Sequence, residues 1–291
     1  MSRGRVAVGG LAAVATLALA APAGAGDPGY GSGKRFSTYA ACEKDAGRAD
    51  RFCFAGAKPA AILRARERDR VHYRVCLRGG GKPKCKEKTT RREGSRSRIR
   101  FGKQGKGKYR FIWFVNGRKV DRDRLLFHKR AVFHVGDSLG VGTKPYLPQA
   151  LNDWKVSQSV KVARHGFEAV SILRNRDSLP GAIVMSIGGN DDPNNVGGFR
   201  DTVAKAVRIA GPNRCVVWPN HYSTKPVNGG TFGGYNEVLQ DFERRNRNFR
   251  IVNWAAIARA HPGWMASDGI HVNATGYQAR ARAIAKQVRR C

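Results

Sequence analysis

The chain has 291 residues, of which 54 are Lys or Arg and 21 are Asp or Glu, so its formal charge is +33. This length allows two domains, and this charge exceeds what solubility alone requires. After the first 25 residues, no segment approaches the roughly 18 consecutive apolar residues of a membrane-spanning helix. The composition therefore argues against a multi-span membrane protein.

The first 25 residues have the pattern of a removable secretory signal peptide. A basic start over residues 1–5 precedes an apolar stretch over residues 6–21, and Ala23-Gly24-Ala25 suits a signal-peptidase site. An uncleaved N-terminal anchor is the alternative, but the short apolar stretch favours cleavage. We expect a mature chain that is secreted or extracytoplasmic, possesses no transmembrane segment and is associated with the cell wall if its charge serves binding.

Positive charge is concentrated in the first part of the mature chain. Residues 26–130 contain 31 basic and 10 acidic residues, a formal charge of +21. Such a surface attracts polyanions, and export favours an anionic cell envelope, an acidic glycan or an acidic lipid over nucleic acid. An arginine-rich composition with no selected partner is the alternative.

Six cysteines follow the expected cleavage site, and an even number in an exported chain favours disulfides. A zinc site is the weaker interpretation, because no CxxC pair or suitably spaced histidine pair is present. The cysteines are Cys42, Cys53, Cys76, Cys85, Cys215 and Cys291.

Residues 26–130 carry strand and hairpin signals. The segments "VHYRVCL" and "PKCKEKTT" flank Gly79-Gly80-Gly81, and "YRFIWFVNG" alternates apolar with polar residues. Facing strands would bring Cys76 and Cys85 together, which leaves Cys42 and Cys53 as a second local pair. We therefore expect a basic, mainly β module whose disulfides compensate for a small core. It shows no catalytic constellation, and its aromatic strand is interpreted as core in preference to a stacking surface.

Residues 131–291 have a different pattern, in which short apolar runs alternate with segments of helical character. This alternation predicts an α/β domain with a parallel sheet covered on both faces, and about 160 residues suffice for one such domain. The apolar runs are "AVFHVG", "GAIVMSIGG", "RCVVWPN" and "FRIVNW", and the helical segments are "FRDTVAKAVRIA", "YNEVLQDFERRNR" and "TGYQARARAIAKQVRR".

The predicted sheet also suggests a partner for each of the two remaining cysteines. Cys215 opens a parallel strand, and the last helix runs back antiparallel from the catalytic edge of the sheet before ending at Cys291. Both cysteines are therefore expected at the edge where the strands begin, joined as a disulfide.

Loops at the carboxyl ends of parallel strands converge on one crevice, and polar residues occur there. Ser138 follows the first apolar run. Asp268 and His271 precede a helix that we expect Thr275 to cap. A serine hydroxyl needs a base, and the base needs a group that fixes its tautomer. Ser138, His271 and Asp268 are thus the candidate nucleophile, base and orienting group.

Acyl transfer also needs hydrogen-bond donors held ready for the developing oxyanion. The candidates are the backbone N–H of Ser138, the backbone N–H of Gly166 and the side-chain amide of Asn190. Together with the triad they form a complete set for acyl transfer.

Four segments resemble the sequence blocks of the SGNH, or GDSL-type, hydrolase family, and they occur in the family's order. This resemblance implies a three-layer flavodoxin-like fold and metal-independent ester hydrolysis without a cofactor. It assigns Ser138 as nucleophile, Gly166 and Asn190 to the oxyanion hole, and Asp268 with His271 as the base system. The segments are "VGDSLGVG", "RHGFEA", "IGGND" and "DGIHVNATGY".

The segment "IVNWAAIARAHPGWMASDGIH" is similar to SGNH domains that act on O-acetylated cell-envelope glycans. The resemblance implies a secreted serine esterase that removes short acyl groups, above all acetyl, from carbohydrate. Two alternatives stay open: an O-acetyltransferase with the same triad, and a non-catalytic envelope- or polyanion-binding protein. The resemblance does not cover residues 26–130.

Several other polar or aromatic residues have weaker functional interpretations. His134 is interpreted as a core or supporting histidine in preference to a base. His165 adjoins Gly166, and contact with the substrate is the less favoured interpretation of it. Asp191 and Asp192 are interpreted as solvated or capping groups in preference to metal ligands. Trp264 is interpreted as a core or rim residue.

Overall fold

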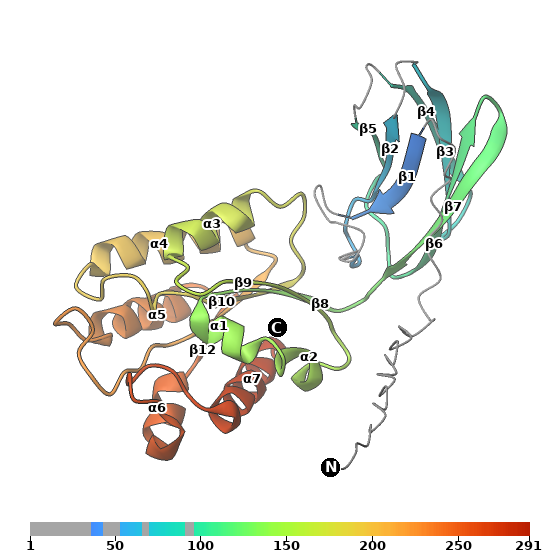
Figure 1. The fold of residues 1–291 in the computed structure, drawn as a ribbon. Coiled ribbons are helices and arrows are strands. Elements are labelled where there is room, and N and C mark those ends of the chain that lie inside the picture. The colour runs from blue at the N-terminus through green and yellow to red at the C-terminus, as the bar shows by residue number, and fades with distance from the viewer. Residues whose placement is uncertain (1–35, 43–52, 66–69, 91–95) are drawn as a thin grey trace, which may run out of the picture.

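The computed structural model describes residues 36–42, 53–65, 70–90 and 96–291. The expected signal peptide lies outside these residues. Figure 1 shows two antiparallel β-sheets, made by the N-terminal strands, beside a parallel sheet flanked by helices. The first strand of the parallel sheet directly follows the last N-terminal strand, with three residues between them.

The N-terminal part is made of β-strands. The smaller sheet is antiparallel and has the order β1 (Phe36–Ala41), β2 (Ala60–Ala65), β5 (Arg96–Arg100). The larger sheet is also antiparallel and has the order β4 (Lys84–Thr89), β3 (His72–Arg78), β6 (Gly107–Val115), β7 (Arg118–Phe127). The hairpin expected around Gly79–Gly81 is present as the antiparallel pair β3–β4.

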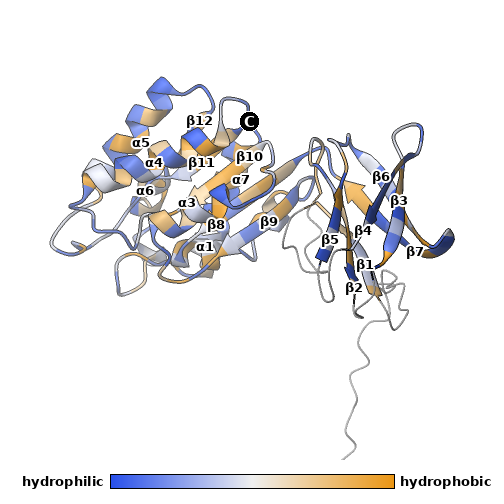
Figure 2. Ribbon diagram, turned by 90° about the horizontal axis from the view of Figure 1, so that it is seen from above, coloured by the Kyte–Doolittle hydropathy of each residue, from blue (hydrophilic) through white to orange (hydrophobic). Residues whose placement is uncertain are grey.

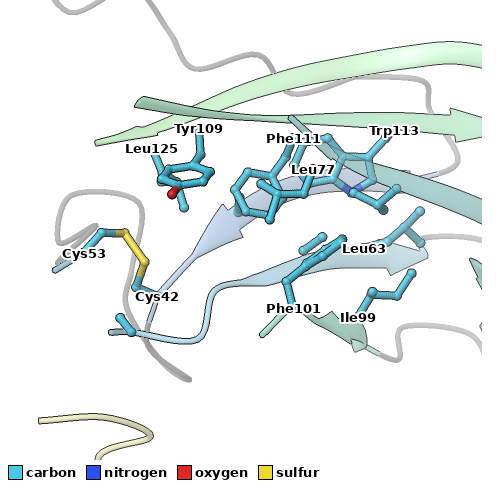
Figure 3. Packing of buried hydrophobic residues seen from close by; sticks show 14 of the residues in the cluster. Cys42, Cys53, Leu63, Leu77, Ile99, Phe101, Tyr109, Phe111, Trp113 and Leu125 are labelled. Atoms are coloured by element: carbon cyan, nitrogen blue, oxygen red, sulfur yellow. A yellow bond between two sulfur atoms is a disulfide. The ribbon is translucent and has the colours of Figure 1, made fainter. Parts of the chain in front are cut away.

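Apolar side chains from both sheets form one core, shown in Figure 3. Phe111 and Trp113 are fully buried there, and the ring of Phe111 meets that of Phe101 edge-on with centroids 5.6 Å apart. The aromatic strand is therefore core. Disulfides join Cys42 to Cys53 and Cys76 to Cys85, so the N-terminal part is a mainly β module with two internal cross-links.

The C-terminal part contains a five-stranded parallel sheet. Its three central strands, β8, β10 and β11, are buried along their whole length, as strands covered on both faces must be. The order is β12 (Phe249–Val252), β11 (Cys215–Pro219), β10 (Ala182–Ser186), β8 (Ala131–Gly136), β9 (Lys155–Val160).

Helices pack on both faces of this sheet and complete a three-layer, flavodoxin-like α/β fold. One face is covered by α3 (Gly166–Arg174), α4 (Val196–Ala210) and α5 (Gly233–Arg245). The other face is covered by α2 (Leu147–Ala150) and α7 (Ala274–Val288). The remaining helices are α1 (Ser138–Thr143), α6 (Trp254–Arg259) and the single 3-10 turn η1 (Pro262–Trp264).

The strand order reverses at β8, which lies between β9 on one side and β10 on the other. In open parallel sheets the crevice outside the carboxyl ends of the strands at such a reversal is the usual ligand site. The third disulfide, Cys215–Cys291, joins the first residue of β11 to the residue that ends the chain after α7, at the opposite edge of the sheet. Among the described residues, no helix combines the length and apolar character that crossing a membrane requires.

Candidate active site

Ser138 lies at the point where β8 turns into α1. Asp137 is the N-cap of α1, and its carboxylate accepts hydrogen bonds from the backbone N–H groups of Leu139 at 3.0 Å and Gly189 at 3.3 Å. A Cβ on Gly136 would lie 2.8 Å from the Cα of Gly140, so only glycine permits this tight turn. The turn therefore presents the Ser138 hydroxyl at the carboxyl edge of the sheet.

The three candidate triad residues form a continuous chain of hydrogen bonds. The Nε2 atom of His271 is 2.8 Å from the Oγ atom of Ser138. Its Nδ1 atom is 2.7 Å from Oδ2 of Asp268. A carboxylate can only accept, so Nδ1 carries the proton and Nε2 is left to accept one from the serine hydroxyl.

A short loop before α7 holds Asp268 and His271. The Oδ1 atom of Asp268 accepts hydrogen bonds from the backbone N–H groups of Ile270 at 2.8 Å and His271 at 2.9 Å. The bond from Ile270 is the largest of the influences that lower the Asp268 pKa to about 2, and the bonds from His271 add to it. The carboxylate is therefore ionised at neutral pH and holds its orientation.

The expectation that Thr275 caps α7 is wrong. Helix α7 begins at Ala274, and its N-cap is Asn273, whose side chain accepts a hydrogen bond from the backbone N–H of Gly276. Asn is at least as good an N-cap as Thr, and the loop that carries His271 ends two residues too early for Thr275 to take that position.

Two of the oxyanion-hole candidates have donors that the protein leaves largely without acceptors. The Ser138 backbone N–H lies at the first position of α1, and no described residue accepts a hydrogen bond from it. The Asn190 side-chain amide makes one long contact, 3.4 Å to the carbonyl of Arg164. Asn190 follows β10, the parallel strand next to β8, and so lies at the same edge of the sheet as Ser138.

The third candidate, Gly166, is differently placed. It is the first residue of α3, and its N–H donates to both carboxylate oxygens of Asp191, at 3.0 and 3.2 Å. The same carboxylate lies 2.9 Å from Nδ1 of His165. The role of Gly166 as an oxyanion donor stays a prediction, and it requires the contact with Asp191 to open.

Two buried arginines support the site, and the sequence analysis missed both. Arg164 is 6% exposed, and its guanidinium donates to the carbonyl oxygens of Gly136, at 3.1 Å, and Ser159. It thereby joins the loop before α3 to the end of β8. The residue before it, Ala163, has a φ of 56°, which is a strained conformation for a side chain with a Cβ.

Arg280 of α7 is the second buried arginine, at 2% exposure. Its guanidinium donates to the Oγ atom of Ser186 at 2.7 Å and lies over the ring of Trp254, 5.1 Å from the centroid. Burial lowers the pKa of Arg280 to about 10. A signal was available in the sequence, since Arg280 shares the helical face of Ile284 and Val288, which are both buried.

His134 is a core histidine, as expected. It is fully buried on β8, its Nδ1 atom is 3.0 Å from Oε1 of Gln158, and burial lowers its pKa to about 4. Asp191 acts as a capping group through its bonds to the start of α3. Among the described residues, no three His, Cys, Asp or Glu side chains gather as a possible metal site.

Two hollows include or adjoin residues of the candidate site. One of about 210 Å³ is lined by Asn190, His165 and the exposed ring of Phe167, among others. Another of about 340 Å³ is lined by residues of the segment between β11 and α5, including Lys225. The Lys225 ammonium donates to the carbonyl of Ser267, next to Asp268, so this second hollow adjoins the loop that carries the base.

No family model matches the sequence, and no curated protein matches it significantly. Solved structures do match its fold. The chain is similar to the C-terminal catalytic domain of Streptococcus pneumoniae peptidoglycan O-acetyltransferase A, with 19% identity and a TM-score of 0.46. The match covers 55% of this chain and 91% of that one.

Two further similarities are of the same kind. A Clostridium thermocellum family 3 carbohydrate esterase matches with 16% identity and a TM-score of 0.45, over 55% of this chain and 98% of that one. A member of the lipolytic G-D-S-L family from Veillonella parvula matches with 14% identity and a TM-score of 0.45, over 54% and 96%. Similarity at this level concerns the fold alone.

Proposed function

We propose that this chain is an exported serine esterase that removes short acyl groups, above all acetyl, from a carbohydrate or cell-envelope glycan. The observation that carries the proposal is the hydrogen-bond chain from Ser138 through His271 to Asp268, with distances of 2.8 and 2.7 Å. A binding protein has no need of a serine whose proton has a base aligned to receive it.

The geometry supports a two-step mechanism through an acyl-serine. As the Ser138 Oγ atom attacks the ester carbonyl carbon, Nε2 of His271 takes the hydroxyl proton, and Asp268 stabilises the resulting imidazolium. The carbonyl oxygen becomes an oxyanion near the Ser138 N–H and the Asn190 amide. Collapse of this intermediate breaks the ester bond, and His271 returns its proton to the departing sugar oxygen.

Release of the acyl group uses the same base. His271 takes a proton from a water molecule, whose oxygen attacks the acyl carbon, and Ser138 recovers its proton when the carboxylic acid leaves. A sugar hydroxyl in place of water would make the enzyme an O-acetyltransferase. The partial exposure of Ser138 supports access by water and by a hydrophilic substrate.

Three disulfides and the expected signal peptide support an extracytoplasmic location, because disulfides persist in oxidising compartments. The glycan assignment rests on the resemblance of the segment over residues 251–271 to SGNH domains that act on O-acetylated envelope glycans.

The test uses the purified mature chain and p-nitrophenyl esters of increasing acyl length, followed by acetylated xylan and acetylated peptidoglycan. We expect turnover of the acetyl ester, weak turnover of long-chain esters, and acetate released from at least one polymer. Ser138→Ala should remove nearly all of this activity and all labelling by a fluorophosphonate, since the label needs the activated hydroxyl.

Ser171→Ala, an exposed serine on α3, is the matched control and should keep full activity and labelling. If Ser138→Ala keeps more than a few per cent of the parent's kcat, or the label maps to another serine, the assignment of the nucleophile is wrong. If the parent hydrolyses no ester, the esterase proposal is wrong and the binding-protein alternative is favoured.

A further inference from the structure

One face of the N-terminal module carries a row of arginines that the proposed chemistry does not use. Arg78 of β3 lies directly opposite Arg110 of β6, which in turn lies directly opposite Arg124 of β7. All three side chains are exposed. Neighbouring strands lie about 4.8 Å apart, so the row places three guanidinium groups across about 10 Å of sheet.

Further cations surround this row on the same face. Side chains alternate between the two faces of a strand. The core between the sheets contains alternate residues of β3, β6 and β7, among them Leu77, Tyr109 and Leu125. The exposed positions face outward, and their hydrophilic character is visible as blue on β3 and β7 in Figure 2. The additional outward cations on these strands are Arg74, Lys108, Lys119 and Arg122.

The acidic residues of these strands do not neutralise the face. Asp121 and Asp123 of β7 are buried on the opposite side, where they accept hydrogen bonds from the Thr38 hydroxyl and the Ala40 backbone N–H of β1. Glu87 of β4 is the exposed acid of the four strands, and it lies opposite Arg74, two rows from Arg78. No described acid forms a salt bridge with Arg78, Arg110 or Arg124.

Like charges directly opposite each other destabilise a sheet, so this row costs the folded protein stability unless an anion lies over it. The row also borders a hollow of about 460 Å³ between β6 and β7. Arg110 and Arg124 line it together with Lys108 and Leu126, which form the next directly opposite pair on the same face, and Leu126 is 49% exposed. The lining of the hollow thus combines guanidinium groups with an exposed apolar side chain.

We propose that this face, defined by Arg78, Arg110 and Arg124, binds an acidic polysaccharide. Guanidinium groups make paired hydrogen bonds to carboxylate or phosphate groups, and sugar rings between those groups offer apolar C–H faces to Leu126. An extended polymer fits a flat pleated surface. The choice of a glycan over lipid or nucleic acid rests on the proposed function, and the exposed apolar area is too small for insertion into a bilayer.

The test compares the full mature chain with the triple variant Arg78→Gln/Arg110→Gln/Arg124→Gln. Binding to polygalacturonate is measured by calorimetry at low and moderate salt, with neutral dextran, polyphosphate, phosphatidylglycerol vesicles and duplex DNA as competing probes. We expect polygalacturonate to bind most tightly and the triple variant to lose at least about tenfold in affinity, with a shallower salt dependence.

The matched control Lys205→Gln/Arg208→Gln/Arg282→Gln removes three exposed cations from α4 and α7. It should lose less than about threefold, and equal losses in both variants would reduce the effect to net charge. Tighter binding of vesicles, DNA or polyphosphate, or no binding of polygalacturonate, would also overturn the proposal.

Two further measurements distinguish a binding role of the arginine row from a catalytic or a structural role. Turnover of p-nitrophenyl acetate should be unchanged in the triple variant, because these residues lie outside the candidate active site. The melting temperature of the unliganded triple variant should rise, since like charges are removed, while polygalacturonate should raise that of the parent only. A lower melting temperature would mean that the row is structural.

Discussion

At the scale of single residues, the ability of the crevice to stabilise an oxyanion depends on which acceptors its hydrogen-bond donors already have. The Ser138 N–H has no protein acceptor among the described residues, the Asn190 amide has one long contact, and the Gly166 N–H is held by Asp191. The developing negative charge on the ester oxygen is therefore expected to rely on Ser138 and Asn190 first.

This leads to a prediction for Asn190→Ala. We expect kcat on a short ester to fall by about 10²–10³-fold, the usual loss for one oxyanion donor. KM should change little, because the amide bonds the charged oxygen more strongly than the neutral carbonyl. Asn194→Ala removes an amide from the same loop and should leave kcat unchanged. A loss below about fivefold for Asn190→Ala would place the oxyanion elsewhere.

The proximity of Ser138, His271 and Asp268 could be predicted from the sequence, since Ser138 comes just after an apolar run and the other two come just before a helical segment. The hydrogen bond that engages the Gly166 N–H could not be predicted, because its acceptor is a carboxylate 25 residues away that a loop brings back to α3. Arg164 was missed because, in a chain with 54 basic residues, a buried arginine has no compositional signal. Arg280 did have a signal, its position on the buried face of a helix.

At the scale of elements, the central strands bring two histidines into the interior. His134 lies on β8, and His221 lies just after β11, packed against the ring of Phe199 and against Gly188. Gly188 has a φ of +122°, and a Cβ there would lie 2.7 Å from the His221 ring. Burial lowers the pKa of His134 to about 4 and that of His221 to about 3.

These two side chains give a pH dependence of stability. An unfolded histidine has a pKa of about 6.5, so below that pH the unfolded chain binds more protons than the folded one. Stability should therefore be fully present above about pH 6.5 and should be lost progressively as the pH falls toward 4. Melting temperatures measured from pH 7 to pH 4 should show this decline.

The variant His221→Gln should flatten the decline, even though it lowers the melting temperature at pH 7 by removing a packed ring. His72→Gln, which changes an exposed histidine of β3, should leave the slope as it is in the parent. Parallel slopes in all three proteins would show that other groups control the acid response.

At the scale of the whole molecule, the apolar interior is divided. Among the residues that the structure describes, the core between the N-terminal sheets contains no side chain from the helices of the C-terminal part. The cores of the C-terminal part lie on the two faces of the parallel sheet. Across the boundary, Asp177 lies 3.4 Å from Arg98 and 3.7 Å from Arg100 of β5. Such partly exposed pairs contribute little stability.

Calorimetric unfolding of the mature chain should therefore show two transitions. The variant Cys215→Ala/Cys291→Ala opens a cross-link between residues 76 apart and should lower the stability of one transition by about 3–5 kcal/mol in the chain-entropy model. The other transition should not move. A single transition that shifts as a whole would mean that the two parts unfold as one unit.

The short, three-residue link between β7 and β8 fixes the distance between the arginine row and the candidate nucleophile within a narrow range. β8 is six residues long, and a strand rises about 3.3 Å per residue, so the nucleophile lies about 20 Å beyond the end of the module that bears the arginine row. A polymer segment held by that row therefore does not reach Ser138 by the same sugar units. The protein would bind one stretch of a glycan network and deacylate a different stretch. The stretch that anchors it would therefore keep its acyl groups.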